Sequence, residues 1–115
     1  MHSDQNSTPL FDALKRYINE KVIPFHVPGH KHGQGLGEFR DYVGESVLQM
    51  DVNGMDDLDY INSPTGVILE AEELFADAFG AQRAFFLVNG TTSGVQSMII
   101  STCRPGSKII LPRNA

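Results

Sequence analysis

The chain has 115 residues, of which 41% are hydrophobic and 20% are charged, a composition typical of one small globular domain and not of a disordered segment. Its formal net charge of -5 provides no general attraction to phosphate backbones or anionic lipids, so we expect neither a nucleic-acid nor a membrane partner. No apolar run approaches the roughly 20 residues of a membrane span, and no secretory signal is recognisable, so a cytoplasmic protein is expected. The single cysteine, Cys103, excludes an internal disulfide, and we interpret it as a small buried hydrophobe.

Residues 1–62 predict an N-terminal arm, made of a short helix and a long loop. Thr8 and Pro9 supply an N-cap and a first-turn proline. Apolar side chains then recur at helical spacing, at Leu10, Leu14, Tyr17 and Ile18. Two prolines and four glycines in residues 22–37 exclude a regular helix or a central strand there. The pattern allows a second short helix over residues 38–44.

Residues 63–115 predict the start of an α/β domain. A helix over residues 64–79 is indicated by Ser63-Pro64 at its start and Gly80 at its end. Its predicted apolar stripe is Val67, Ala71, Leu74, Phe75 and Ala78, and its predicted wet face is Glu70, Glu73 and Asp77. Strands are predicted over residues 84–88 and 108–111, with a helix from Thr92 or Ser93 to Thr102 between them. This order predicts one βαβ unit with a right-handed crossover. Because parallel sheets occur within larger α/β folds, we predict an incomplete domain.

The turn at residues 89–94 is the strongest candidate for a binding site. It lies between a predicted strand and a predicted helix, where unpaired backbone N–H groups and the helix dipole favour a phosphate. Thr91, Thr92 and Ser93 add hydroxyl donors, and Gly90 permits close approach of the backbone. The alternative is a plain N-cap, for which one hydroxyl would suffice. The pattern is neither a Walker loop nor a dinucleotide fingerprint.

Two polar clusters offer weaker candidates. His26, His30 and His32 lie close together in sequence, but His-x-His alone is a weak metal motif and we expect no metal site. The acidic stretch 56–60 could attract a cationic substrate, and Asp57 is its residue to test. The competing interpretation of this stretch is a solvated loop with helix-capping duties, which we prefer.

Taken in order, these segments resemble the ornithine/lysine/arginine decarboxylase family. The motifs that carry the resemblance are Pro24-Phe-His-Val-Pro-Gly-His-Lys-His-Gly33, Asp56-Asp57-Leu58, Ser63-Pro-Thr-Gly66, Ala71-Glu-Glu-Leu-Phe-Ala-Asp-Ala-Phe-Gly-Ala81, Asn89-Gly-Thr-Thr-Ser93 and Ile110-Leu-Pro-Arg-Asn114. The resemblance implies an aspartate-aminotransferase-like fold (fold type I) and pyridoxal 5'-phosphate as cofactor. Thr91, Thr92 and Ser93 would then hold the cofactor phosphate, with Gly90 shaping the turn. The loop with His30 and Lys31 would border the active-site entrance and could reach a neighbouring subunit.

The implied activity is decarboxylation of arginine, lysine or ornithine in polyamine biosynthesis, by a homodimer or higher oligomer. The family's Schiff-base lysine and ring-stacking histidine are expected downstream of residue 115, so we expect no catalytic residue in this chain and no activity from it alone. None of the lysines at positions 15, 21, 31 and 108 is expected to bind the cofactor. Two alternatives remain open: a truncated non-catalytic paralogue that pairs with a full-length subunit, and another enzyme of fold type I.

Overall fold

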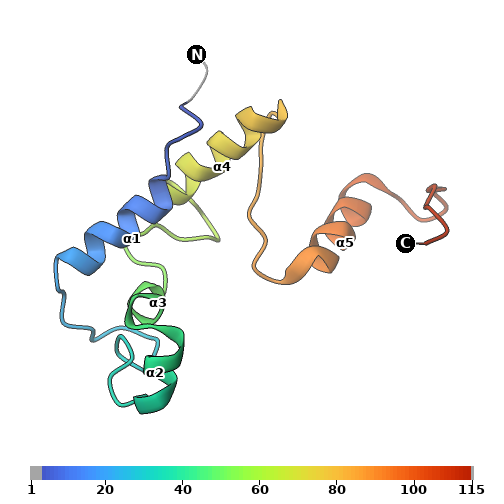
Figure 1. Ribbon diagram of the computed structural model, residues 1–115. Helices are drawn as coiled ribbons and strands as arrows, with labels where there is room; N and C mark the ends of the chain where they lie inside the picture. Colours follow the sequence, from blue (N-terminus) through green and yellow to red (C-terminus); the bar gives the residue numbers. More distant parts are fainter. Residues whose placement is uncertain (1–3, 115) are drawn as a thin grey trace. The chain divides into compact units, whose positions relative to one another are not determined.

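The computed structural model describes residues 4–114 and divides into two compact units, Met1–Ala84 and Phe85–Ala115. We call them the N-terminal unit and the C-terminal unit. Figure 1 shows the helices in the described residues, which are α1 (Pro9–Asn19), α2 (Gly37–Val43), α3 (Glu45–Met50), α4 (Val67–Phe79) and α5 (Gly90–Thr102). The predicted domain boundary between residues 62 and 63 refers to the complete protein and stays a prediction.

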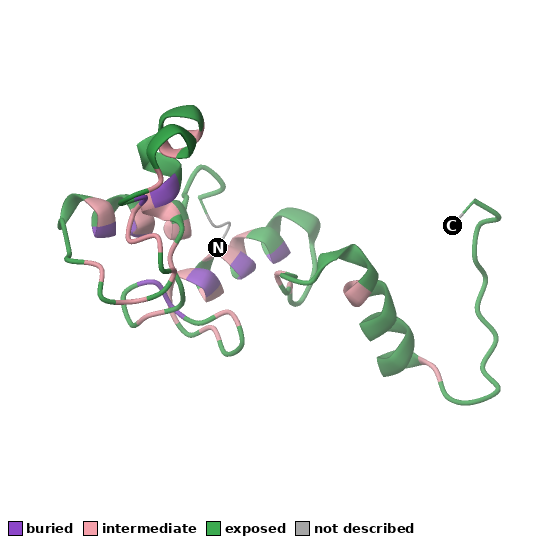
Figure 2. Cartoon of the chain, turned by 90° about the horizontal axis from the view of Figure 1, so that it is seen from below, coloured by how far each residue is buried: buried purple, intermediate pink, exposed green. Residues whose placement is uncertain are grey.

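Helix α1 forms where the sequence predicts it. Pro9 occupies the first turn, and the Thr8 hydroxyl donates to the Asp12 carboxylate at 2.9 Å. The faces of Ala13 and Tyr17 are buried against Leu58, at 2%, 4% and 3% exposure. Partly buried apolar side chains surround these three, at Leu14, Ile18, Val52, Met55 and Val67. This small cluster is the core of the N-terminal unit. Figure 2 colours all buried positions purple, the cluster among them.

Helix α4 packs against α1. It ends where the sequence predicts but begins later than predicted. Its C-terminus is as predicted, because Gly80 adopts the left-handed conformation at φ +63°. Its start lies at Val67 and not at residue 64, since Thr65 and Gly66 are held outside the helix by a carboxylate described below.

The predicted burial on α4 needs correction. Its buried positions are Ile68, Glu72 and Ala76, a stripe adjacent to the predicted one, whereas Phe75 is 49% exposed. Helix α1 therefore covers the edge of the apolar face and not its centre. The polar face is confirmed, with Glu70, Glu73 and Asp77 all exposed.

Helices α2 and α3 follow the loop of residues 22–36 and pack together (Figure 1). The possible helix over residues 38–44 is confirmed as α2, while α3 was not predicted. Gly44, at φ +89°, separates the two helices, and the Arg40 guanidinium pairs with Glu45 at 2.8 Å across that break. The sequence pattern treats this glycine as a helix end, and the chain starts a new helix directly after it.

The predicted βαβ unit is not confirmed. Among residues 4–114 no strand is formed, and residues 84–88 and 108–111 are extended segments outside any helix. Two strands are too few for a stable parallel sheet, which needs further strands and helices on both faces. Between these segments α5 starts at Gly90, two or three residues before the predicted start, and it ends at Thr102 as predicted.

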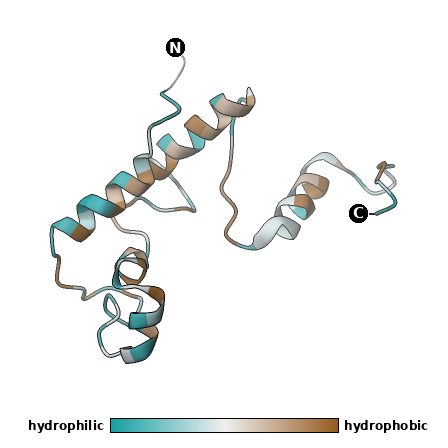
Figure 3. Cartoon of the chain, viewed as in Figure 1, coloured by the Kyte–Doolittle hydropathy of each residue, from teal (hydrophilic) through white to brown (hydrophobic). Residues whose placement is uncertain are grey.

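The C-terminal unit exposes much of its apolar surface. None of the α5 residues is buried, and Figure 3 shows apolar positions along both extended segments. The most exposed are Val88, Ile100 and Ile110, at 79%, 79% and 100%. Cys103, predicted to be buried, is half-buried. In the described part of the chain, no helix combines the length and the apolar character needed to cross a membrane.

Two glycines in the loop before α2 allow a matched test of its packing. Gly33 and Gly35 have nearly the same φ, +84° and +81°, but a Cβ on Gly33 would lie 2.6 Å from Leu48 Cδ1, while a Cβ on Gly35 meets nothing within 4 Å. We expect about 1 kcal/mol of backbone strain from alanine at either position. Gly33→Ala should cost a further ~1–3 kcal/mol through overpacking against Leu48.

The two unfolding free energies are compared by denaturant titration of the intact protein. Equal losses for Gly33→Ala and Gly35→Ala would show that the Leu48 side chain moves aside for the added methyl group without cost.

Candidate functional site

A buried carboxylate organises the start of α4. The Asp59 side chain, 5% exposed, accepts hydrogen bonds from backbone N–H groups on both sides of the helix start. Oδ1 accepts from Tyr60 at 2.8 Å and from Thr65 at 3.0 Å. Oδ2 accepts from Gly66, Ile68 and Leu69 at 2.8, 3.1 and 3.4 Å. Asp59 therefore serves as an N-cap contributed from outside the helix, in place of a capping side chain at Gly66.

The chain reaches this geometry through a tight turn. Residues 55 and 59 form an antiparallel bridge, and Asp59 takes a left-handed conformation at φ +67°. The turn buries Leu58 in the core and aims Asp59 at α4. Burial by itself would raise the pKa of Asp59, but the N–H donors of Thr65 and its neighbours outweigh that effect and lower the pKa to about 2.

The predicted substrate contact Asp57 lies at the exposed tip of the same turn. The capping duty that we preferred for this acidic stretch falls on Asp59, two residues later. The structure does not bring Asp57 together with His30 or Lys31 through any hydrogen bond or ion pair recorded for the described residues, and its role as a substrate contact stays a prediction.

The second organised region is the loop of residues 26–36, which we call the histidine loop. The Tyr17 hydroxyl, from α1, contacts Nε2 of His26 and lies 3.4 Å from Nε2 of His32. The rings of Tyr17, His26 and His32 form a triangle with all three centroid distances at 5.8 Å. Burial, with the charges of His26 and His30 adding to it, lowers the pKa of His32. Burial also raises the pKa of Tyr17, so this hydroxyl keeps its proton at neutral pH.

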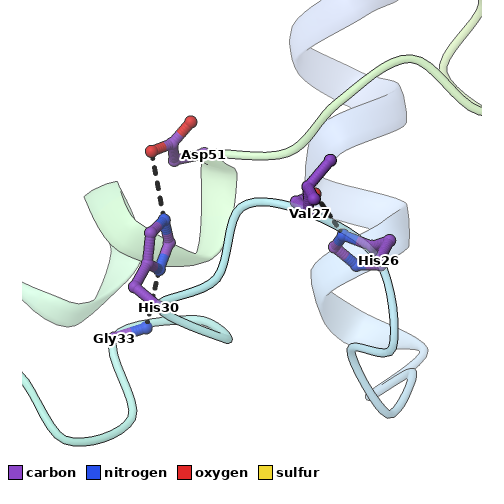
Figure 4. A network of polar contacts seen from close by, with 5 residues as sticks. All are labelled: His26, Val27, His30, Gly33 and Asp51. Atoms are coloured by element: carbon purple, nitrogen blue, oxygen red, sulfur yellow. Dashed lines mark hydrogen bonds and ion pairs between the residues drawn. The ribbon is translucent and has the colours of Figure 1, made fainter.

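The predicted site residue His30 bridges the histidine loop and the end of α3, as Figure 4 shows. Its Nδ1 accepts from the backbone N–H of Gly33 at 3.1 Å. Its Nε2 therefore carries the proton and donates to Asp51 Oδ2 at 3.1 Å. Sequence reasoning did not identify Asp51, which stands 21 residues from its partner.

The predicted site residue Lys31 belongs to the same loop. Its ammonium group donates to the backbone carbonyl of His26, and its φ of +49° is left-handed. His30 and Lys31 are thus brought together in one folded loop, but each side chain has a partner within it. Within residues 4–114, no group of three or more His, Cys, Asp or Glu side chains is arranged to hold a metal ion.

The predicted phosphate turn forms the first turn of α5. Gly90 has φ +78°, a conformation that favours glycine, and a Cβ on Gly94 would collide with Leu87. The N-cap position, Asn89, makes no side-chain capping bond, so the first N–H groups of α5 face outward without a cap from it. Thr91 and Thr92 are exposed, and the Ser93 hydroxyl donates to the Gly90 carbonyl at 2.7 Å. The turn thus presents backbone and hydroxyl donors in one place.

A comparison with known protein families matches residues 8–115 to the family described as Orn/Lys/Arg decarboxylase, major domain. The chain belongs to this family. Family membership implies an aminotransferase-like fold for the complete domain.

The curated relatives support the same assignment. The chain is 43% identical over 111 residues to arginine decarboxylase of Bacillus subtilis and 45% identical over 111 residues to that of Bacillus anthracis. It is 30% identical over 118 residues to the constitutive lysine decarboxylase of Escherichia coli. Each match covers 96% of this chain but only 23%, 22% and 16% of the relative. The chain thus spans less than a quarter of the length of these relatives. No solved structure gives a significant match.

Asp59 provides a prediction about acid stability. Its pKa is lowered from 3.8 to about 2, so the stability that it contributes is present above about pH 4 and is lost as the pH falls from about 4 to about 2. Asp59→Asn should lower the melting temperature at neutral pH and remove this part of the acid dependence. The measurement is a series of thermal melts of the intact protein between these pH values.

The matched control is Asp57→Asn, which changes an exposed carboxylate of the same turn. It should melt like the unchanged protein. If the two variants have the same melting temperature at neutral pH, the cap at α4 does not stabilise the fold.

Proposed function

We propose that this chain is part of a pyridoxal-phosphate-dependent decarboxylase that acts on a basic amino acid. The observation that carries the proposal is the family match over residues 8–115, together with relatives named arginine, lysine and ornithine decarboxylases. Arginine is the first substrate to test, because identity is 43–45% to the arginine decarboxylases cited above against 30% and 27% to a lysine and an ornithine decarboxylase.

The first turn of α5 fits the cofactor phosphate. A phosphate needs several convergent donors, positive potential and space for the backbone to approach. The turn supplies outward N–H groups at a helix N-terminus, the exposed hydroxyls of Thr91 and Thr92, and glycine at position 90. The Ser93 hydroxyl donates to the Gly90 carbonyl. The hydroxyl can rotate toward a ligand and donate to it instead.

In this proposal the residues of the chain bind and orient, while other parts of the protein complete the site. Bound pyridoxal phosphate supplies an electron sink for loss of the carboxylate. Thr91, Thr92 and Ser93 would anchor its phosphate and so fix the position of the ring. None of the lysines present is assigned to the cofactor: Lys31 is bound within the histidine loop, and Lys15 pairs with Asp12 at 2.6 Å.

A non-catalytic paralogue that pairs with a full-length subunit is the alternative. An activity assay distinguishes the decarboxylase from this alternative, because a non-catalytic paralogue would release no carbon dioxide when purified by itself. The oligomer expected from the family resemblance, a homodimer or larger assembly, belongs to the proposal and is measured on the same preparation by light scattering.

The phosphate assignment predicts a loss of cofactor affinity. Thr91→Val keeps the shape of the side chain but removes the hydroxyl, and a hydrogen bond to a charged group is worth ~1.5–3 kcal/mol. We expect about a tenfold or greater rise in the Kd for pyridoxal phosphate, measured by equilibrium dialysis of the intact protein.

Ser101→Ala is the control for this measurement. Ser101 lies on the same helix and donates to a backbone carbonyl of its own turn, that of Met98, at 3.1 Å. It should leave the Kd unchanged. An unchanged Kd in both Thr91→Val and Thr92→Val would show that the cofactor phosphate does not bind at this turn.

The substrate assignment is tested with the intact protein and pyridoxal phosphate. Arginine, lysine and ornithine are supplied separately, and the amine product and carbon dioxide are measured. Product from arginine at the highest kcat/KM is expected. No amine from any of the three substrates would contradict the decarboxylase and favour the non-catalytic alternative.

A further inference from the structure

The histidine loop is fastened to α1 through a single hydroxyl shared by two imidazoles. Tyr17 is 4% exposed, and its hydroxyl meets His26 on one side and His32 on the other. A phenol has one proton to donate and lone pairs with which to accept. The two histidines therefore cannot play the same part, and the order of donors can be worked out from their other contacts.

The backbone of residue 27 fixes the direction of this chain of hydrogen bonds. His26 Nδ1 lies 2.7 Å from the Val27 carbonyl oxygen, as Figure 4 shows, and a carbonyl only accepts. Nδ1 therefore carries the proton of the neutral ring, which leaves Nε2 as the acceptor for the Tyr17 hydroxyl. The Tyr17 oxygen then accepts from His32 Nε2. The direction is His32 to Tyr17 to His26.

The arrangement can accept one added proton but not two. With one proton added to His26, its Nε2 would donate to the Tyr17 oxygen, and the hydroxyl could turn to donate to His32 Nε2. With both rings protonated, neither Nε2 can accept, so the buried Tyr17 hydroxyl loses both acceptors. Two cationic rings would also lie with centroids 5.8 Å apart. Double protonation therefore opposes the contact that holds the loop to α1.

The other charged groups near the cluster do not relieve this conflict. The Lys31 ammonium is already bonded to the His26 carbonyl, and Lys21 lines the same cavity of about 300 Å³ as His32. From α3 this cavity receives Gln49, which is uncharged, and the loop itself contributes Gln34. The nearby acid, Asp51, is engaged with His30. Added protons would thus enter a region that already holds two cations.

We propose that the histidine loop is an acid-sensitive latch, closed on α1 while at least one of His26 and His32 is neutral and released when both are protonated. The proposal does not depend on the decarboxylase assignment, because it uses only contacts within the N-terminal unit. The direction of the lowered pKa of His32 agrees with it, since a closed state that disfavours the proton loses stability as the pH falls through the ordinary imidazole value of about 6.5.

Hydrogen exchange of the full-length protein tests the latch. The reporters are the N–H groups of Gln34 and Leu36, which bond to carbonyls within the loop at 3.3 and 3.2 Å. Between about pH 7.5 and about pH 5.5, and after correction for the intrinsic exchange rate, their protection should fall by up to about tenfold per pH unit below about 6.5. Peptides from α4 should keep their protection over the same range.

Three variants assign the effect to these residues. Tyr17→Phe removes the shared hydroxyl and should give low protection already at the higher pH. His26→Gln combined with His32→Gln removes the titrating groups and should make the protection of the loop independent of pH. His30→Gln, which changes the neighbouring histidine outside the triangle, should keep the pH dependence.

Equal protection of the unchanged loop at both pH values would overturn the proposal. So would a pH dependence that survives in the double variant or disappears in His30→Gln, since the latter would assign the effect to the contact between His30 and Gly33. If the double variant fails to fold, the unchanged protein and Tyr17→Phe still decide, because the latch requires low protection in Tyr17→Phe at the higher pH.

Discussion

The carboxylate of Asp59 is the interaction on which the N-terminal unit depends. Its oxygens accept backbone N–H groups from both sides of the start of α4, and a negative charge at that end also complements the helix dipole. The same turn places Leu58 against Ala13 and Tyr17. One tight turn therefore determines both where α4 begins and how the turn meets α1.

Tyr17 extends this connection to the histidine loop. Its ring belongs to the core with Ala13 and Leu58, while its hydroxyl reaches His26 and His32. The loop is also joined to α3 through His30 and Asp51, and Gly33 lies against Leu48. A segment with two prolines and four glycines is thus ordered by side chains from the helices around it, and not by regular backbone pairing.

The parts that could be predicted from the sequence are those with local causes. Proline at position 9 and glycine at position 80 mark helix ends through their own backbone preferences, and the turn at Gly90 is found where its residue types indicate. The sequence predicts a capping duty for the acidic stretch 56–60 but does not single out Asp59, because its partners lie as far as ten residues along the chain and Asp57 has the same chemistry. The pairing of His30 with Asp51 has no sequence signal at all. Strands depend on partners elsewhere, so apolar runs predict where a strand can form and not whether it is paired.

The N-terminal unit has a buried core and the C-terminal unit does not, and this difference bears on the order in which the two units fold during synthesis. The core cluster of the N-terminal unit joins residues between Ala13 and Val67, and the last buried apolar residue of the unit is Ala76. Since a ribosome delivers the chain from its N-terminus, these contacts are available before the segment from residue 84 onward emerges. The exposed Val88, Ile100 and Ile110 therefore emerge from the ribosome after α1 and α4 are able to pack against each other. The period of exposure to aggregation and to chaperones is therefore set by the later segment, and substitutions that slow its burial should affect yield more than they affect the architecture of the first 84 residues.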